Sequence, residues 1–497
     1  MENREKLSSR LGFLLLSAGC AIGCGNVWKF PWMCGQYGGA AFVVIYLLCL
    51  LVLGLPVMIT EFAMGRASQK SPLYMYQALE NKGSKWHVHG PFAFVGNLLL
   101  MMFYTVVTGW MFYYFVQFVL GNNAALSFGS MLSQPSVNVG FMALVVVLGF
   151  GILTFNIQKG LERVTKYMML CLFVLMIVLA VRSCTLQGAG EGLSFYLKPD
   201  FSAITGNVVV GAMNQAFFTL SLGIGSMAIF GSYIDKKRSL MGESISVICF
   251  DTLAALLAGL IIFPACSAYG TDVGAGPALL FNTMATVFNN MQGGRIWGAL
   301  FFLFMVFAAM STILAVFENI LAMVREKTGW DRKKGSIICA VALFVLSLPC
   351  ALGFNVWAGF QPFASGSSFL DLWDFCVSNC LLPIGSLAFV IFCSWGTVKA
   401  GKKHFGWGWE NFRAEANTGD GLKLPDWMKY IYRFVVPVII IVVFVFGMAT
   451  FAWRDAPAEE VVDEPAVEEA GEAETEEAVE GEAAEADEES EKTEETK

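Results

Sequence analysis

Residues 17–26 read SAGCAIGCGN and lie in the middle of a largely apolar stretch that runs from 11 to 36. Each of the three glycines at 19, 23 and 25 lowers helix stability by about 1 kcal/mol relative to alanine. Unwound backbone at membrane depth is tolerated only where it is buried in protein or lines a cavity. The stretch therefore predicts a membrane-spanning helix that is broken near its midpoint, beside the polar Asn26.

A second stretch of the same kind covers residues 206–233, where positions 217–226 read FFTLSLGIGS. Small residues in such runs also allow two helices to pack closely. Polar residues accompany both runs, however, and the two runs lie five spans apart. Broken helices at matching places in two halves of a chain indicate the binding site of a transporter.

The composition excludes a soluble protein. Of 497 residues, 56% are hydrophobic and only 14% are charged, and the mean hydropathy is +0.61, whereas a soluble domain carries about 25% charged residues. A membrane-spanning helix needs about 20 apolar residues. We therefore expect an all-α membrane protein with eleven transmembrane helices, at 11–36, 39–65, 91–120, 138–157, 164–184, 206–233, 241–268, 296–324, 336–352, 371–397 and 429–453. The short segment 277–290 is expected to be a re-entrant or surface helix.

The basic residues predict the orientation, because cytoplasmic loops carry an excess of lysine and arginine. Of the 32, 25 lie on the side of the N-terminus, five on the other side and two in the C-terminal tail. A multi-pass protein of the cell membrane with a cytoplasmic N-terminus and an extracytoplasmic C-terminus follows. Residues 454–497 hold 20 acidic and 3 basic residues, and we expect this acidic tail to be disordered.

A broken helix offers two kinds of ligand. Freed N–H groups attract a carboxylate, and freed carbonyl oxygens suit small cations. Ionisable residues within spans are costly and are functional candidates by default; here these are Lys29, Glu61, Asp251, Glu318, Asp371 and Asp374. For Glu318 and Asp371, a polar interior or interface position explains the sequence equally well.

Four motifs point to a known family: GNVWKFP at 25–31, GGAAF at 38–42, EFAMGR at 61–66 and QAFFTLSLGIG at 215–225. Together they resemble the neurotransmitter:sodium symporter family in its bacterial form. The resemblance implies a sodium-coupled symporter that works by alternating access, with broken helices 1 and 6 in a 5+5 inverted repeat. The implied parts are a gate segment at 1–10, repeats at 11–184 and 206–397, an extra helix at 429–453 and the tail at 454–497.

The resemblance also implies two sodium ions. The first site would comprise Ala21, Asn26, Thr219 and Asp251, together with the carboxylate of the substrate. The second would comprise Gly19, Ile22, Ala308, Ser311 and Thr312. The hydroxyls at 311 and 312 could instead bond to the preceding turn of their own helix.

Position 23 indicates the substrate class. Monoamine transporters of the family carry an aspartate there, whereas Gly23 leaves room for the carboxylate of an α-amino acid. The resemblance places that carboxylate at the Cys24 and Gly25 amides and the Tyr104 hydroxyl, and the ammonium at carbonyls near Ala21, Phe218, Thr219 and Ser221. The implied side-chain pocket is uncharged and predicts a neutral apolar or aromatic amino acid; its residues are Leu100, Tyr104, Phe218, Ser221, Ile224, Thr312 and Val316.

The implied gates lie on either side of this pocket. Lys29 and Asp374 form the outer pair, and Arg4 and Glu326 form the inner pair, braced by Tyr233. Tyr104 and Phe218 would cover the substrate. The family usually has an arginine in place of Lys29, and a lysine lacks the bidentate geometry of arginine.

One departure from the family concerns chloride. Chloride-dependent members carry asparagine and serine where this chain has Asp251 and Ala255. Two like charges at ~4 Å repel by roughly 4 kcal/mol at an effective dielectric constant of 20, so we expect chloride-independent transport in which Asp251 takes the place of the halide. A second hypothesis is that Asp251 returns protonated after sodium leaves, which would give proton counter-transport.

Other functions remain open at this stage. A non-transporting amino-acid sensor or channel on the same fold is one, and a transporter of a betaine or a non-α amino acid is another. An enzyme is not expected, because no constellation of nucleophile or metal-ligand spacing occurs. The expected partners are a small-molecule amino acid and the lipid bilayer, without nucleic acid, and the sequence leaves the oligomeric state unknown.

Overall fold

The computed structural model describes residues 7, 9–155, 157–271, 273, 279–363, 365–395 and 405–451. It divides the chain into two units, Met1–Ala456 and Pro457–Lys497. The second unit, the whole acidic tail from residue 454 and the gate residue Arg4 lie outside the described residues. Within these ranges the secondary structure is helical, apart from one isolated β-bridge between Arg238 and Asp420.

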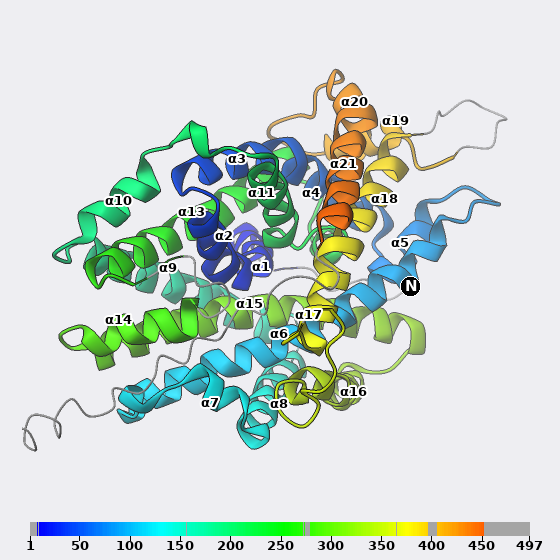
Figure 1. Cartoon of the computed structure of the whole chain (residues 1–497). Coiled ribbons are helices and arrows are strands. Elements are labelled where there is room, and N and C mark those ends of the chain that lie inside the picture. Colours follow the sequence, from blue (N-terminus) through cyan, green and yellow to red (C-terminus); the bar gives the residue numbers. More distant parts are fainter. Residues whose placement is uncertain are drawn as a thin grey trace, which may run out of the picture. The chain divides into compact units, whose positions relative to one another are not determined.

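The helices follow the order of the apolar stretches (Figure 1). The α-helices are α1 (Arg10–Ala21), α2 (Phe30–Gln36), α3 (Ala40–Cys49), α4 (Leu55–Ser68), α5 (Pro72–Leu79), α6 (His89–Leu120), α7 (Phe128–Leu132), α8 (Pro135–Leu153), α9 (Arg163–Cys184), α10 (Ala189–Leu197), α11 (Gly206–Thr219), α12 (Ser226–Gly231), α13 (Leu240–Ala268), α14 (Met284–Asn290), α15 (Gly294–Thr328), α16 (Arg332–Leu352), α17 (Phe369–Asp374), α18 (Leu382–Ser394), α19 (Trp409–Ala416), α20 (Met428–Tyr430) and α21 (Val436–Thr450). Short π-type or 3-10 turns extend several of them, at Gly25–Lys29, Leu50–Gly54, Trp86–Val88, Asn123–Ala125, Gln158–Glu162, Phe201–Ala203, Leu279–Thr283, Phe375–Leu381 and Ile431–Val435.

Nine continuous helices in the described ranges are long and apolar enough to span a membrane: Ala40–Ser68, Trp86–Leu120, Pro135–Leu153, Gly160–Cys184, Leu240–Ala268, Gly294–Thr328, Arg332–Leu352, Phe369–Ser394 and Met428–Ala449. A tenth span results if Arg10–Ala21 and Gly25–Gln36, which meet at an angle of 53°, are taken together. The pair α11 and α12 is not in this count, because a longer break separates the two helices.

The ends of the spans differ from the expected ones by several residues, because helices continue past the apolar stretch into polar sequence. The third span begins at Trp86 rather than at 91, and Pro91 is accommodated in the first turn of α6, where its missing N–H is not needed. The helix α15 continues to Thr328 and ends at Gly329, whose φ of 73° is a left-handed C-cap. The short segment expected at 277–290 is helical from Leu279 to Asn290, and its first two residues are not described.

The helix α1 is buried on every side. Every residue from Gly12 to Ala21 is buried, and α1 packs against α13 and α15 near the middle of the bundle (Figure 1). In contrast, α21 exposes a row of apolar side chains that includes Val438, Ile441 and Val445. A helix that is buried all round must carry its polar groups inward, so the break in α1 opens into protein rather than into lipid.

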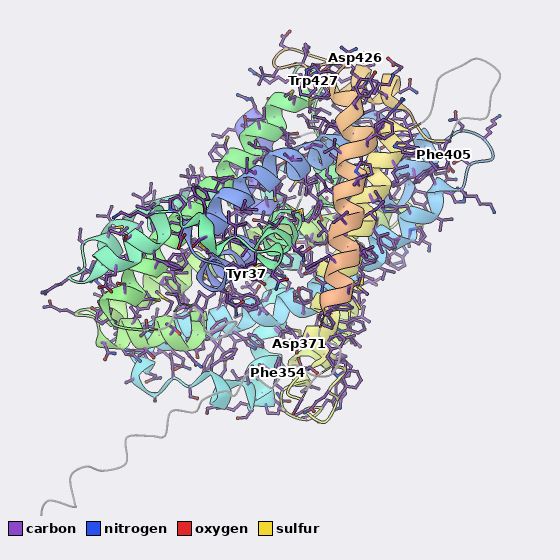
Figure 2. The ribbon with its side chains drawn as sticks, turned by 45° about the horizontal axis from the view of Figure 1, so that its top comes forward. Tyr37, Phe354, Asp371, Phe405, Asp426 and Trp427 are labelled. Atoms are coloured by element: carbon purple, nitrogen blue, oxygen red, sulfur yellow. The ribbon has the colours of Figure 1, made fainter. Side chains whose placement is uncertain are left out.

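Loops on the two sides of the bundle lie at opposite ends of α21. Figure 2 shows Asp426 and Trp427 near its first residues, and Phe354 and Asp371 near its last. Phe375, which follows α17, packs against Phe451 at the end of α21, with ring centroids 4.2 Å apart. The distribution of basic residues predicts that successive loops alternate between the two sides of the membrane, and loops at opposite ends of α21 agree with such an alternation.

Candidate functional site: two broken helices

The first break follows Ala21, the last residue of α1. Ile22 has an extended backbone (φ −74°, ψ 100°), and the chain resumes as a π-type turn at Gly25. The low helix propensity of the glycines here reduces the cost of leaving the helix. The Ile22 carbonyl oxygen accepts hydrogen bonds from the hydroxyls of Ser311 and Thr312 on α15, at 3.3 Å each.

The second break separates α11 from α12 and comprises residues 220–225. Ser221, Gly223 and Gly225 have φ values of 51°, 98° and 74°. This left-handed conformation strains a serine but not a glycine, and such strain of about 1–3 kcal/mol is typical of functional sites. The Ser221 hydroxyl donates to the carbonyl oxygen of Cys20 at 3.4 Å. The two breaks therefore lie against each other.

Glu61 of α4 binds backbone N–H groups at the second break and so holds it in place. Its carboxylate accepts hydrogen bonds from the Gly223 amide at 2.6 Å and from the Met227 amide at 3.1 Å. The side chain is fully buried. Glu61 was a candidate because of its charge alone, and the structure gives it a positioning role for the backbone of the break.

Replacing Glu61 by glutamine should loosen this segment. Glu61→Gln turns one acceptor oxygen into a donor that faces a backbone N–H, and a buried donor left without a partner costs about 1–3 kcal/mol. We expect a fall of about tenfold or more in the uptake of the amino-acid substrate that the sequence predicts, measured in proteoliposomes at equal protein content. The matched control is Glu191→Gln at an exposed position of α10; equal uptake by the two variants would contradict this role.

A backbone carbonyl group of the same break is bound by a pair of asparagines. The sequence analysis did not predict either of them as a site residue. Asn97 of α6 donates to the Ile224 carbonyl oxygen at 2.8 Å, and its own side-chain oxygen accepts from Asn319 of α15 at 2.9 Å. Both asparagines are fully buried. A polar residue inside an apolar span is the signal that could have identified them.

A buried carboxylate lies beside the first break. Asp251 of α13 accepts hydrogen bonds from the Asn26 amide at 2.8 Å, from the Thr219 hydroxyl at 3.2 Å and from the Tyr46 hydroxyl at 3.4 Å. The Asn26 side-chain oxygen in turn accepts from the Gly23 amide. No lysine, arginine or histidine in the described part of the chain forms an ion pair with Asp251.

An unpaired carboxylate in a protein interior is strongly unfavourable. Oxygen atoms gather around Asp251, and oxygen is a hard ligand. Such a group of ligands favours a small hard cation over a metal ion that prefers nitrogen or sulfur. The structure therefore brings together three of the four residues expected at the first sodium site. The fourth, Ala21, lies at the end of α1 and borders the neighbouring cavity.

The residues of the expected second sodium site also converge. The Thr312 hydroxyl lies 3.3 Å from each of the Gly19, Cys20 and Ile22 carbonyl oxygens. The Ser311 hydroxyl bonds to the Ala308 carbonyl oxygen of its own helix at 2.8 Å, besides its contact with Ile22. Ser311 thus bonds to the preceding turn of its own helix, and both hydroxyls also contact carbonyl oxygens at the end of α1, so the oxygens of α1 and α15 form one cluster.

A small cavity of ≈ 10 Å³ lies where residues of the two breaks meet. It is lined by Ala21, Gly25, Leu100, Tyr104, Phe218, Ser221, Thr312 and Leu382, of which all but the last were expected. Leu382, from the first turn of α18, carries no sequence signal that distinguishes it from its apolar neighbours. The Tyr104 hydroxyl accepts a hydrogen bond from the Cys24 amide at 2.7 Å, at one edge of the cavity.

Two expected pocket residues do not border this cavity. Ile224 and Val316 are fully buried but are absent from its lining. Ile224 packs into the notch left by Gly96 on α6, where an added Cβ would lie 2.6 Å from Ile224 Cγ2. Its side chain is therefore directed to α6.

The outer gate residues lie close together. The Lys29 ammonium is 3.7 Å from the Asp374 carboxylate and 3.4 Å from the Ser378 hydroxyl. It also lies 4.1 Å from the centre of the Phe218 ring, within the range of a cation–π interaction. Asp371, by contrast, forms a capping box with Ser368 at the start of α17, which is a structural role.

The inner gate is described in part, because Arg4 lies outside the described residues. The Glu326 carboxylate forms an ion pair with Lys70 at 2.9 Å and accepts from the Ser71 amide at 2.8 Å. The Tyr233 hydroxyl donates to Glu318 at 3.0 Å. Glu318 is buried and forms an ion pair with Arg332.

Comparison with known proteins agrees with this geometry. The sequence model of the sodium:neurotransmitter symporter family matches residues 4–124 and 118–457. The chain is 35% identical over 448 residues to the sodium-dependent transporter YhdH of Bacillus subtilis, which covers 88% of this chain and 96% of that protein. It is 31% identical over 461 residues to a sodium-dependent transporter of Haemophilus influenzae, covering 89% and 98% of the two chains.

A solved structure is similar as well. The crystal structure of MhsT in complex with L-phenylalanine superposes with a TM-score of 0.79 at 34% identity, over 89% of this chain and 99% of that one. The family is one of sodium-dependent membrane transporters rather than enzymes. The two broken helices, the buried oxygen clusters and these similarities lead to one conclusion: the chain belongs to the sodium:neurotransmitter symporter family.

Proposed function

We propose that the protein couples the entry of two sodium ions to the uptake of a neutral apolar or aromatic α-amino acid. The observation that carries this proposal is the buried Asp251 carboxylate, which meets three neutral hydrogen-bond donors and no cationic side chain of the described residues. A sodium ion supplies the missing charge. The second ion would be held by the oxygens of Gly19, Ile22 and Ala308 with the two hydroxyls of α15.

The proposed architecture has eleven spans in the cell membrane, with the N-terminus in the cytoplasm and the C-terminus outside. The broken pair α11 and α12 is taken as one span, as is the bent pair at 10–36. Residues 11–184 and 206–397 are the two inverted repeats, and 429–453 is the additional helix. The 25-to-5 distribution of basic residues supports this orientation.

The substrate would bind where the two breaks meet. Its carboxylate would contact the Cys24 and Gly25 amides, the Tyr104 hydroxyl and the first sodium ion, and its ammonium would contact the carbonyls freed at the breaks. Leu100, Phe218 and Leu382 would surround the side chain. These side chains carry no charge, and the similar MhsT structure was solved with L-phenylalanine, which supports an apolar or aromatic substrate.

A cavity of ≈ 10 Å³ has room for one water molecule at most, so binding requires the lining to move apart. The proposed movement is that of alternating access. Separation of Lys29 from Asp374 would open the outer side, while the ion pairs of Glu326 and Glu318 hold the cytoplasmic side closed. Two sodium charges crossing 100 mV release about 4.6 kcal/mol, at ~2.3 kcal/mol each.

Uptake into proteoliposomes tests this function. An inward sodium gradient should drive accumulation of at least one of leucine, phenylalanine, tryptophan and tyrosine, and a potassium gradient should not. Betaine and γ-aminobutyrate should not compete; competition by either would instead favour a non-α substrate. Sodium-dependent binding without accumulation would identify a sensor or a channel and would contradict symport.

Transport should not require chloride. The fixed negative charge of Asp251 lies where a halide would otherwise balance sodium, and the Tyr46 hydroxyl, 3.4 Å away, already donates to it. Replacing chloride by gluconate on both sides of the membrane should leave the initial rate of uptake unchanged within about twofold. A loss of uptake in gluconate would show that Asp251 does not take the place of the anion.

A further inference from the structure

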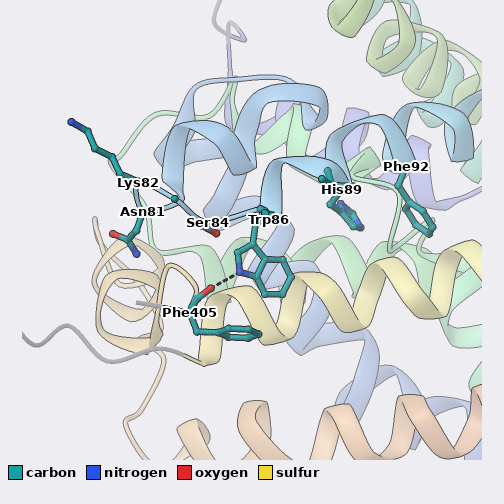
Figure 3. A pocket seen from close by; sticks show the side chains of 10 residues that line it. Asn81, Lys82, Ser84, Trp86, His89, Phe92 and Phe405 are labelled. Atoms are coloured by element: carbon teal, nitrogen blue, oxygen red, sulfur yellow. Dashed lines mark hydrogen bonds between the residues drawn. The ribbon is translucent and has the colours of Figure 1, made fainter. Parts of the chain in front are cut away.

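A second cavity lies at the first turn of α6, and none of its lining residues borders the cavity at the two breaks. It is a groove of ≈ 540 Å³ between residues 81–92 and Phe405. Figure 3 shows Trp86, His89 and Phe92 along one side, with Phe405 beneath them. Two hydrogen bonds hold the loop before α6 against residues 405 and 406. The Trp86 indole donates to the Phe405 carbonyl oxygen, and the Asn81 side-chain amide donates to the Gly406 carbonyl oxygen.

The groove has a polar end and an apolar end. Lys82 and Lys85 lie in the loop before α6, whereas Val88 and Phe92 continue along the helix toward the middle of the span. Val88 and Val95, which have 63% and 47% of their surfaces exposed, extend the apolar face. The acidic Glu80 nearby is paired with His87, at 2.6 Å. A basic rim above an exposed apolar surface matches the boundary between lipid headgroups and acyl chains.

The His89 ring forms an aromatic wall of the groove. It packs against the rings of Tyr76 and Phe92, with ring centroids 4.7 Å and 5.1 Å apart. Both ring nitrogens of His89 are buried and have no hydrogen-bond partner among the described residues, so they are closed to a group bound in the groove. His89 therefore offers such a group its carbon atoms, and the charged contacts come from the lysines.

We propose that this groove binds an anionic phospholipid of the leaflet at this end of α6. Lys82 and Lys85 hold the phosphate, and one acyl chain lies along Val88 and Phe92. A free phosphate would leave the aromatic and aliphatic part of the groove uncovered, and a neutral lipid would not use the two lysines. In the proposed orientation this leaflet is the cytoplasmic one.

Native mass spectrometry of the full-length protein in detergent tests the proposal. Palmitoyl-oleoyl phosphatidylglycerol and the corresponding phosphatidylcholine are titrated separately. We expect one phosphatidylglycerol to be retained about tenfold or more tightly than phosphatidylcholine. The Lys82→Gln/Lys85→Gln variant should bind phosphatidylglycerol about 30-fold more weakly, since each basic residue near an anionic headgroup contributes about fivefold. His89→Phe keeps the aromatic wall of the groove and should leave lipid binding unchanged.

The control removes the same charge elsewhere on the same side of the bundle. Lys327→Gln/Lys333→Gln alters two exposed lysines outside the groove and should leave lipid binding unchanged. Inorganic phosphate at millimolar concentration should not displace the lipid. Equal retention of phosphatidylglycerol by the wild type and the Lys82/Lys85 variant, equal affinity for the two lipids, or displacement by inorganic phosphate would each overturn the proposal.

Discussion

Gly23→Ala is expected to weaken strongly the binding of the proposed amino-acid substrate at the broken helices. The Cβ of an alanine at this position would overlap the Tyr104 hydroxyl and the Thr312 Oγ1 atom. These two oxygens take part in the proposed substrate and sodium sites, so neither can withdraw without loss of a ligand. Overpacking of this kind costs about 1–3 kcal/mol, which corresponds to a loss of affinity of about 5- to 150-fold.

Binding of a radiolabelled substrate amino acid to purified protein, over a range of sodium concentrations, measures this effect. The matched control is Gly140→Ala in α8, where a Cβ would meet no atom within 4 Å. The control should bind like the wild type, and it should be slightly more stable because alanine favours a helix. If Gly23→Ala elutes as the same monodisperse species as the wild type and binds substrate with the same affinity, the site does not lie at the first break.

Asp251→Asn should have the second largest effect, on sodium rather than on the amino acid itself. The substitution keeps the shape of the side chain but removes the charge that balances the proposed first ion. Hydrogen bonds from Asn26, Thr219 and Tyr46 would then converge on a neutral group. We expect the sodium concentration for half-maximal binding to rise about tenfold or more, in line with about 1.5–3 kcal/mol for interactions with a charged group.

The same variant should gain a response to chloride. Without the carboxylate, an anion beside Tyr46 would no longer be repelled, and adding Ala255→Ser would supply a further hydroxyl donor to it. Chloride should therefore lower the sodium requirement of the Asp251→Asn/Ala255→Ser double variant, while it leaves the wild type unaffected. Asp200→Asn, at an exposed site, controls for the change in net charge. Unaltered sodium dependence in Asp251→Asn would exclude this carboxylate as a ligand.

The sequence was sufficient to locate both breaks, because glycine and polar residues inside an apolar span are costly unless they line a site. Gly19, Gly23 and Gly25 marked the first break, and the interruption after Ala21 falls among them. The proximity of Asn26 to Asp251 could not follow from spacing, since 225 positions separate them. It rested on the resemblance to a family, and the structure places the two side chains 2.8 Å apart.

Other parts of the site depend on the rotation and depth of helices, which an apolar sequence does not specify. Leu382 is one apolar residue among many in α18, and only the packing of that helix beside the second break makes it part of the cavity. The direction of Ile224 depends on the space that Gly96 leaves on another helix. The predicted ends of the spans also differed from the observed ones, because the helices extend beyond the apolar stretches into the polar sequence on either side.

The most direct test of the central claim is the thermal stability of the purified full-length protein with each of the twenty amino acids. It is measured in sodium gluconate and in potassium gluconate. A ligand at a hundred times its dissociation constant stabilises the folded state by about 2.7 kcal/mol. The proposed site predicts that at least one neutral apolar or aromatic amino acid raises Tm by several degrees in sodium and not in potassium. No stabilisation by any amino acid, or an equal rise in both salts, would contradict a joint site for sodium and an amino acid at the two breaks.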